Sequence, residues 1–108
     1  IARNFKEHKK KFGLGMINRK AKGNRNERRS MDYYEKQGYY CTKSSASLGM
    51  WDFVGYSKSD WICVQVKSNR GPRSLEMMEL KEAEVPPNTK KLVHVWKDYQ
   101  REPEIEEL

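Results

Sequence analysis

Residues 61–67 constrain the fold of this chain more than any other stretch. The sequence Trp-Ile-Cys-Val-Gln-Val-Lys is apolar almost to its end, which is typical of a buried strand. Side chains two residues apart in a strand share one face, so Gln65 and Lys67 project together while Val64 and Val66 face the other way. An amide and an amine on one face of an apolar strand indicate a functional site. A half-solvated strand face is the alternative interpretation.

The remaining pattern predicts a sheet with helices packed on it. We expect a helix over residues 24–37, with Asn24 as its N-cap and Gly38 just past its end, and a helix over residues 74–84 capped by Ser74. Strands are expected at residues 39–42, 51–56, 61–67 and 91–96, the middle two forming an antiparallel hairpin. The predicted fold class is α/β (α+β), with the order α-β-β-β-α-β and a mixed central sheet flanked by helices.

Charge divides the 108 residues unevenly. Residues 1–29 hold 11 Lys and Arg against two acids, whereas the whole chain carries +7. We expect a basic N-terminal arm over residues 1–22, one folded domain over residues 23–101 and an acidic C-terminal tail without regular structure over residues 102–108. Because a basic arm suits a polyanion, nucleic acid is the expected partner, with a solubilising tail as the alternative.

Several classes of protein are disfavoured. No apolar run approaches the length of a membrane span and no signal-peptide pattern opens the chain, so we expect a cytoplasmic, intracellular protein without a membrane partner. The two cysteines, Cys41 and Cys63, are expected to be reduced thiols rather than a disulfide. His8 and His94 lack partners at zinc-ligand spacing, and no small-molecule cofactor is predicted.

Apolar residues in the predicted strands and second helix have two interpretations. They belong to the core or to a dimer interface, in preference to base-stacking platforms. The strand set is Trp51, Phe53, Trp61 and Trp96, and the helix set is Leu75, Met77, Met78 and Leu80.

Four positions supply the oxygen donors that phosphodiester hydrolysis with a divalent cation requires. Glu27, on the inward stripe of the first predicted helix with Met31 and Tyr34, and Asp52, at the start of a strand, offer carboxylates. The Gln65 side-chain oxygen and the backbone carbonyl of Val66 complete the metal set.

Two further residues would assist the reaction, and each assignment has a competitor. Lys67 would assist the attacking water or offset phosphate charge, and Ser47 would help to place the phosphate. Glu27 alone could be the second half of a capping box begun by Asn24. Asp52 alone could be the polar start of a strand, and Ser47 loop filler. The joint arrangement favours a site.

The motifs Lys22-Gly-Asn-Arg-Asn-Glu-Arg28, Ser47-Leu-Gly-Met-Trp-Asp52 and Val64-Gln-Val-Lys67 together resemble the PD-(D/E)xK nuclease superfamily. Within it they are most similar to Holliday-junction resolvases of archaea and of their viral or phage relatives. The resemblance covers about residues 20–97 and implies a restriction-endonuclease-like core. It also implies catalytic roles for the matching residues Glu27, Ser47, Asp52, Gln65 and Lys67.

The resemblance implies a Mg²⁺-dependent endonuclease, with Mn²⁺ as a substitute, that acts as a homodimer on four-way DNA junctions. The chain departs from the family pattern at Trp51, where the family has Pro, and at Gln65, where it has Glu or Asp. An amide carries no charge, so weaker metal binding is expected. Cleavage of flaps, nicks or duplex by the same fold, and an idle nucleic-acid-binding module, are the alternatives. The expected nucleic-acid contacts are Lys22, Arg25, Arg28, Arg29, Lys43, Arg70 and Arg73.

Overall fold

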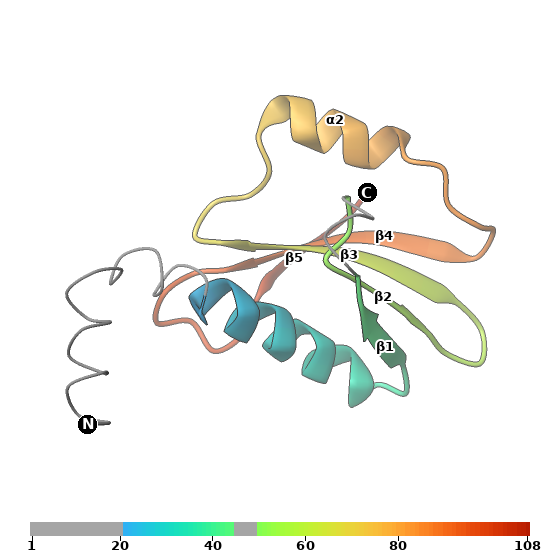
Figure 1. The fold of residues 1–108 in the computed structure, drawn as a ribbon, viewed down its shortest axis with the longest axis horizontal. Helices are drawn as coiled ribbons and strands as arrows, with labels where there is room; N and C mark the ends of the chain where they lie inside the picture. Colours follow the sequence, from blue (N-terminus) through green and yellow to red (C-terminus); the bar gives the residue numbers. More distant parts are fainter. Residues whose placement is uncertain (1–20, 45–49) are drawn as a thin grey trace, which may run out of the picture.

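The computed structural model describes residues 21–44 and 50–108 (Figure 1). A first helix covers residues 21–35. It is followed by β1 (Tyr40–Lys43), β2 (Phe53–Tyr56), β3 (Trp61–Ser68), α2 (Ser74–Glu82), β4 (Thr89–Trp96) and β5 (Glu104–Glu107). The order α-β-β-β-α-β-β confirms the predicted fold class and adds one strand at the end.

All five strands belong to one mixed sheet, in the order β1-β2-β3-β4-β5. The first three pair antiparallel, which confirms the predicted hairpin between β2 and β3. Strands β3 and β4 run parallel, with Gln65 opposite Val93. Because parallel neighbours need a crossover connection, α2 joins them. This topology brings the carboxyl ends of β3 and β4 to the same end of the sheet.

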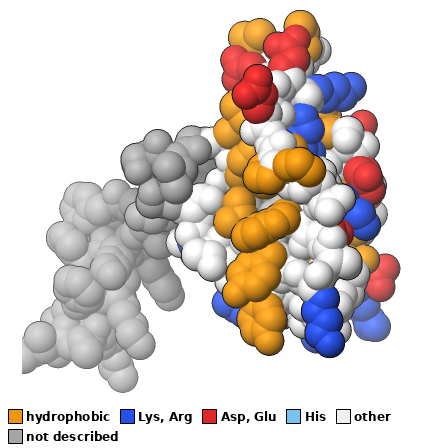
Figure 2. All heavy atoms as spheres, turned by 90° about the vertical axis from the view of Figure 1, so that its right-hand side faces the viewer, with side chains coloured by type: hydrophobic (Ala, Val, Ile, Leu, Met, Phe, Trp, Pro, Cys, Tyr) orange, Lys and Arg blue, Asp and Glu red, His pale blue; other side chains and the backbone are white. Residues whose placement is uncertain are grey.

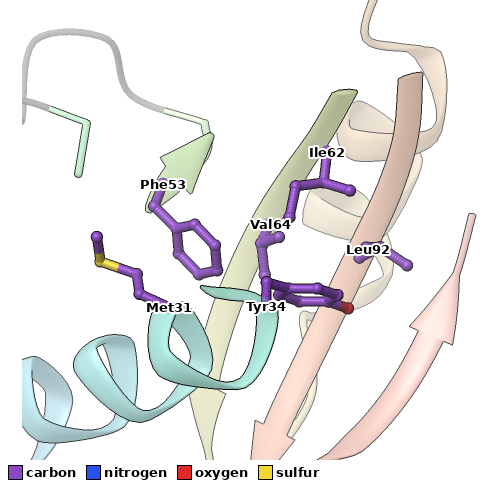
Figure 3. Packing of buried hydrophobic residues seen from close by; sticks show 6 residues of the cluster. All are labelled: Met31, Tyr34, Phe53, Ile62, Val64 and Leu92. Atoms are coloured by element: carbon purple, nitrogen blue, oxygen red, sulfur yellow. The ribbon is translucent and has the colours of Figure 1, made fainter. Parts of the chain in front are cut away.

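The two helices cover opposite faces of the sheet, with α2 over β3 and β4 (Figure 1). The main core lies on the side of the first helix, where apolar side chains of that helix and of three strands meet (Figure 3). The members drawn there are Met31, Tyr34, Phe53, Ile62, Val64 and Leu92. Met31 and Tyr34 are buried as predicted, and Glu27 lies on the same stripe at the half-buried end of the helix.

A buried polar network also fastens the first helix to β4. Ser30 Oγ lies 2.9 Å from His94 Nδ1 and accepts a hydrogen bond of 2.7 Å from Trp96 Nε1. His94 Nε2 lies 2.8 Å from the Tyr34 hydroxyl. A neutral imidazole protonated on Nε2 satisfies all of these partners, because Ser30 can then donate to Nδ1. The helix that carries Glu27 is thus held by hydrogen bonds as well as by apolar contacts.

Both predicted N-caps are wrong. The first helix already includes residue 21, so Asn24 lies inside it and accepts a hydrogen bond from Lys43 Nζ at 3.3 Å. The capping-box interpretation of Glu27 therefore does not hold. The N-cap of α2 is Arg73, without a side-chain cap, and Ser74 is the first helical residue. Gly38, by contrast, has φ of +101°, as a residue just past a helix end requires.

The acidic segment after residue 102 is not without regular structure. Residues 104–107 form β5, which pairs antiparallel with β4 and places Ile105 opposite His94. All four residues of β5 are exposed, so backbone pairing to β4 provides its stability. No β propensity marks this segment, because three of its four residues are Glu. Most of the predicted basic arm, residues 1–20, lies outside the described residues.

The expected core assignment of the large apolar residues is correct only in part. Phe53, Trp96 and Leu80 are buried, but Trp61, Leu75 and Met78 have exposed fractions of 47%, 69% and 55%. Hydrophobic side chains form a column down the end of the molecule that carries the β2–β3 hairpin (Figure 2). Cys41 and Cys63 are both free thiols, as predicted. In the described part of the chain, no helix is long and apolar enough to cross a membrane.

Candidate active site

The end of β3 presents its two polar side chains as the sequence predicted. Val64 is fully buried on the side of the first helix, whereas Gln65 and Lys67 point to the face that α2 covers. Gln65 lines a cleft of about 310 Å³ together with Glu76 and Leu80 of α2. Its Oε1 atom is buried and accepts no hydrogen bond within the described residues. Leaving a buried acceptor without a hydrogen bond costs about 1–3 kcal/mol of stability. The Gln65 oxygen therefore marks a place where a bound ligand or cation could provide the missing partner.

Asp52 is fixed to the edge of β3 by two hydrogen bonds. Its N–H donates to the Val64 carbonyl at 2.9 Å, and its Oδ2 accepts from the Val66 N–H at 2.7 Å. The N–H and C=O of one strand residue point to the same side, so the Val66 carbonyl also faces the side where Asp52 lies. Burial raises the pKa of the Asp52 carboxyl, although the Val66 N–H and the charge of Lys67 act in the opposite direction. Asp52 is therefore oriented, and it is costly to ionise without a cation nearby.

Glu27 reaches the same region from the first helix. Its side chain is 19% exposed, and Lys43 Nζ lies 3.4 Å from its Oε1. Burial raises the pKa of the Glu27 carboxyl, and the negative charge of Asp52 raises it further. Glu27 on the helix thus lies within reach of the charge of Asp52, which precedes β2. Lys43, expected to contact nucleic acid, is instead ion-paired with Glu27.

Lys67 has a partner that the sequence analysis missed. Its Nζ lies 3.0 and 3.1 Å from the two carboxylate oxygens of Glu76, in the first turn of α2. The charge of Glu76 also contributes to raising the pKa of Asp52, so it acts on the same site. The parallel crossover carries the start of α2 over the end of β3. An acid in the first turn of such a helix is the signal that could have identified Glu76.

Two clefts contain most of the predicted phosphate-binding residues, and the first of them includes Lys67 of the site. One cleft, of about 580 Å³, is lined by Lys67, Arg70 and Arg73 beside Glu76. The other, of about 300 Å³, holds residues of the first helix and of the β4–β5 connection. Its cations are Lys22, Arg25, Arg29 and Lys97.

One predicted nucleic-acid contact is already engaged in ion pairs. Arg28 Nη2 lies 2.6 Å from Asp32 Oδ1 and 2.6 Å from Glu35 Oε1, on the exposed side of the first helix. Its charge is thus balanced within the helix.

The donor set fits a hard divalent cation of the Mg²⁺ type. Within residues 21–44 and 50–108, no three His, Cys, Asp or Glu side chains gather closely enough to bind a metal by themselves. Mg²⁺ is commonly held through one or two carboxylates and keeps several waters. Glu27 and Asp52 supply those carboxylates, and the unpaired Gln65 oxygen and the Val66 carbonyl supply neutral donors. Ser47, the predicted phosphate-placing residue, lies outside the described residues.

Comparison with known proteins bears on the fold. No protein-family model matches the chain, and no curated protein matches it. Among solved structures, the chain is similar to Hjc, a Holliday junction resolvase from the archaeal hyperthermophile Archaeoglobus fulgidus. The TM-score is 0.61 over 75% of this chain and 72% of that chain, at 15% sequence identity. The chain therefore shares its fold with this resolvase, which agrees with the fold class predicted from the sequence.

Proposed function

We propose that this protein is a Mg²⁺-dependent DNA endonuclease that recognises structured DNA and resolves four-way junctions. The convergence of Glu27, Asp52, Gln65 and Lys67 at one end of a resolvase-type sheet carries the proposal. None of these residues is specific alone, but each is contributed by the element on which the motifs require it. The Gln65 oxygen is buried without a hydrogen-bond partner among the described residues, which is difficult to explain as ordinary core.

The residues divide the chemical work. Glu27, Asp52, Gln65 and the Val66 carbonyl would hold Mg²⁺, which supplies Lewis acidity toward a phosphate oxygen and toward a water molecule. Lys67 donates hydrogen bonds to the phosphate oxygens, where negative charge accumulates during the reaction. Glu76 is a positioning residue, because it holds the Lys67 ammonium at the end of β3. The carboxylates must be ionised to bind metal, so activity should fall as the pH drops through their raised pKa values.

The DNA backbone would cross the end of the sheet. Arg70 and Arg73 flank the cleft that contains Lys67, so they are placed to contact phosphates next to the scissile one. Paired cleavage of a four-way junction needs two sites. We therefore include a homodimer in the proposal, and Mn²⁺ should substitute for Mg²⁺.

A panel of synthetic DNA substrates tests this proposal. A four-way junction, a flap, a nicked duplex and a matched duplex of the same sequences are incubated with Mg²⁺, with Mn²⁺ or with EDTA, and the products are resolved on denaturing gels. The proposal predicts symmetric nicks near the branch point that require metal and appear only with the junction. Equal cutting of all four substrates would assign the fold to a general nuclease.

A second candidate function is an idle nucleic-acid-binding module. Two observations favour it: Gln65 lacks the charge of the family carboxylate, and Lys67 is held in an ion pair by Glu76. This candidate predicts tight junction binding without cleavage in any metal. The same panel, with a gel-shift measurement on each substrate, separates the two functions.

A further inference from the structure

The connection between β4 and β5 holds a tyrosine in an unusual conformation. The Gln100 N–H donates to the Lys97 carbonyl at 3.2 Å, which closes a turn with Asp98 and Tyr99 at its centre. Tyr99 has φ of +68°, at the turn position where Gly or Asn is normally required. Its side chain is fully exposed. A bulky residue in this conformation is disfavoured, and fold stability alone would select glycine there.

Neighbouring side chains hold this turn in place. The Asp98 N–H donates to Asn69 Oδ1 at 3.0 Å, and Asn69 Nδ2 donates to Asp98 Oδ2 at 3.3 Å. Lys22, from the first helix, forms an ion pair with the same Asp98. The turn is therefore tied both to the end of β3 and to the first helix. These anchors keep Tyr99 projecting from a fixed place.

The surroundings of Tyr99 are strongly cationic. The cleft that it lines also contains Lys22, Arg25, Arg29 and Lys97. Lys22 is paired with Asp98, and Lys97 lies 3.0 Å from Glu104. Arg25 and Arg29 therefore remain as cations without a carboxylate partner among the described residues. Figure 1 shows that this connection lies beside the start of the first helix, at the end of the sheet that carries the candidate active site. Arg29 stacks over Trp96 at 3.9 Å from the ring centroid, which fixes one guanidinium at the wall of the cleft.

Other exposed aromatic rings of the described chain lack this combination. Tyr40, Tyr56 and Trp61 lie opposite one another on β1, β2 and β3. Their rings contact each other, with centroid distances of 5.4 and 5.2 Å, as cross-strand pairs do. They lie at the hairpin end of the sheet, away from the active site. Tyr99 is the exposed ring that projects singly beside a group of cations.

We propose that Tyr99 stacks on a DNA base that has left the helical stack, while Arg25 and Arg29 contact the phosphates on either side of that base. An aromatic ring beside cations suits an unstacked nucleotide, because the ring covers the base face and the cations neutralise the backbone. Any base can stack, so the contact selects DNA structure rather than sequence. Branch points and single strands offer such bases, and continuous duplex does not. This inference rests on the DNA-binding part of the proposed function.

Equilibrium binding to fluorescently labelled DNA tests the proposal. The probes are a four-way junction, a single strand and a matched duplex, measured in Ca²⁺ in place of Mg²⁺. Loss of one stacked base corresponds to a decrease in affinity of about 5- to 150-fold. Tyr99→Gly should weaken binding to the junction and the single strand by a factor in this range, and binding to duplex by less than about twofold. Tyr99→Phe should bind all three probes as the wild type does.

Two controls separate this role from a structural one. Glycine suits the positive φ, so the melting temperature of Tyr99→Gly should not fall. Tyr40→Ala, which removes an exposed tyrosine at the hairpin end, should leave all three affinities unchanged. Equal loss on all three probes, or no loss with Tyr99→Gly, would overturn the stacking role and leave the proposed nuclease function intact. If the wild-type protein bound none of the probes, both proposals would be wrong.

Discussion

Acidification should weaken the attachment of the first helix to the sheet through His94. This imidazole is fully buried, and burial lowers its pKa from 6.5 to about 4. Its neutral form satisfies Ser30 and Tyr34. Above the pKa of the unfolded chain, a histidine whose pKa is lowered by folding is neutral in both states and does not affect the free energy of unfolding. Below that pH, the unfolded chain binds a proton that the folded chain does not, which favours unfolding. Stability should therefore be lost as the pH falls from about 6.5 to 4.

The size of the loss follows from the two pKa values. One pKa unit corresponds to about 1.36 kcal/mol, so the full effect approaches about 3 kcal/mol below pH 4 and about 2 kcal/mol at pH 5. Urea unfolding of the wild type and of His94→Gln at pH 7.5 and at about pH 5 measures it. The neutral glutamine does not titrate, so the difference between the two pH dependences isolates His94 and cancels the carboxylates.

An independent measurement covers the case in which His94→Gln does not fold. The chain has two histidines, so a His8→Asn variant leaves a single imidazole signal in a proton NMR titration. Between pH 7.5 and 5 that signal should move by no more than about a tenth of its full titration shift. A midpoint near 6.5, or identical pH dependences for wild type and His94→Gln, would refute the reasoning.

Three further predictions concern the site. Gln65→Glu should tighten Mg²⁺ binding in calorimetry and lower the melting temperature in EDTA, because it adds a negative charge to the cleft that already holds Glu76; an unchanged Mg²⁺ affinity would argue against Gln65 as a ligand. Glu76→Gln should lower kcat for junction cleavage by about tenfold with little change in junction affinity, since about 1.4 kcal/mol of Lys67 positioning is lost; a raised kcat would make Glu76 an inhibitor. Replacing Arg70 and Arg73 by Ala should reduce the slope of log affinity against log salt by about 1.8, and an unchanged slope would remove them from the interface.

The parts of the fold that follow from local periodicity could be predicted from the sequence. Alternation in residues 61–67 placed Gln65 and Lys67 on one face, and the helical stripe carried Glu27 inward with Met31. These predictions needed only the spacing at which side chains return to the same face, two residues in a strand and three to four in a helix. The hairpin between β2 and β3 likewise followed from two β-prone runs and a short turn.

The parts that depend on tertiary pairing could not be predicted in this way. Strand β5 is nearly all glutamate, and only its backbone pairing with β4 makes it a strand. Glu76 enters the site because the crossover places α2 over the end of β3, which no local pattern records. The positive φ of Tyr99 depends on a turn that the hydrogen bonds between Asn69 and Asp98 hold in place, so the local sequence did not predict it.

Metal binding and junction cleavage by Asp52→Asn test the central claim most directly. Asparagine can still accept the Val66 N–H through its side-chain oxygen, so the strand edge should stay intact while the charge is lost. Asp32→Asn, which removes a carboxylate on the exposed side of the first helix, is the matched control. Wild type and control should nick the junction symmetrically with Mg²⁺. Asp52→Asn should lose at least about 100-fold in rate, about 2.7 kcal/mol, with weaker Mg²⁺ binding but unchanged junction affinity. Mg²⁺-dependent cleavage that survives in Asp52→Asn would contradict the assignment of the active site.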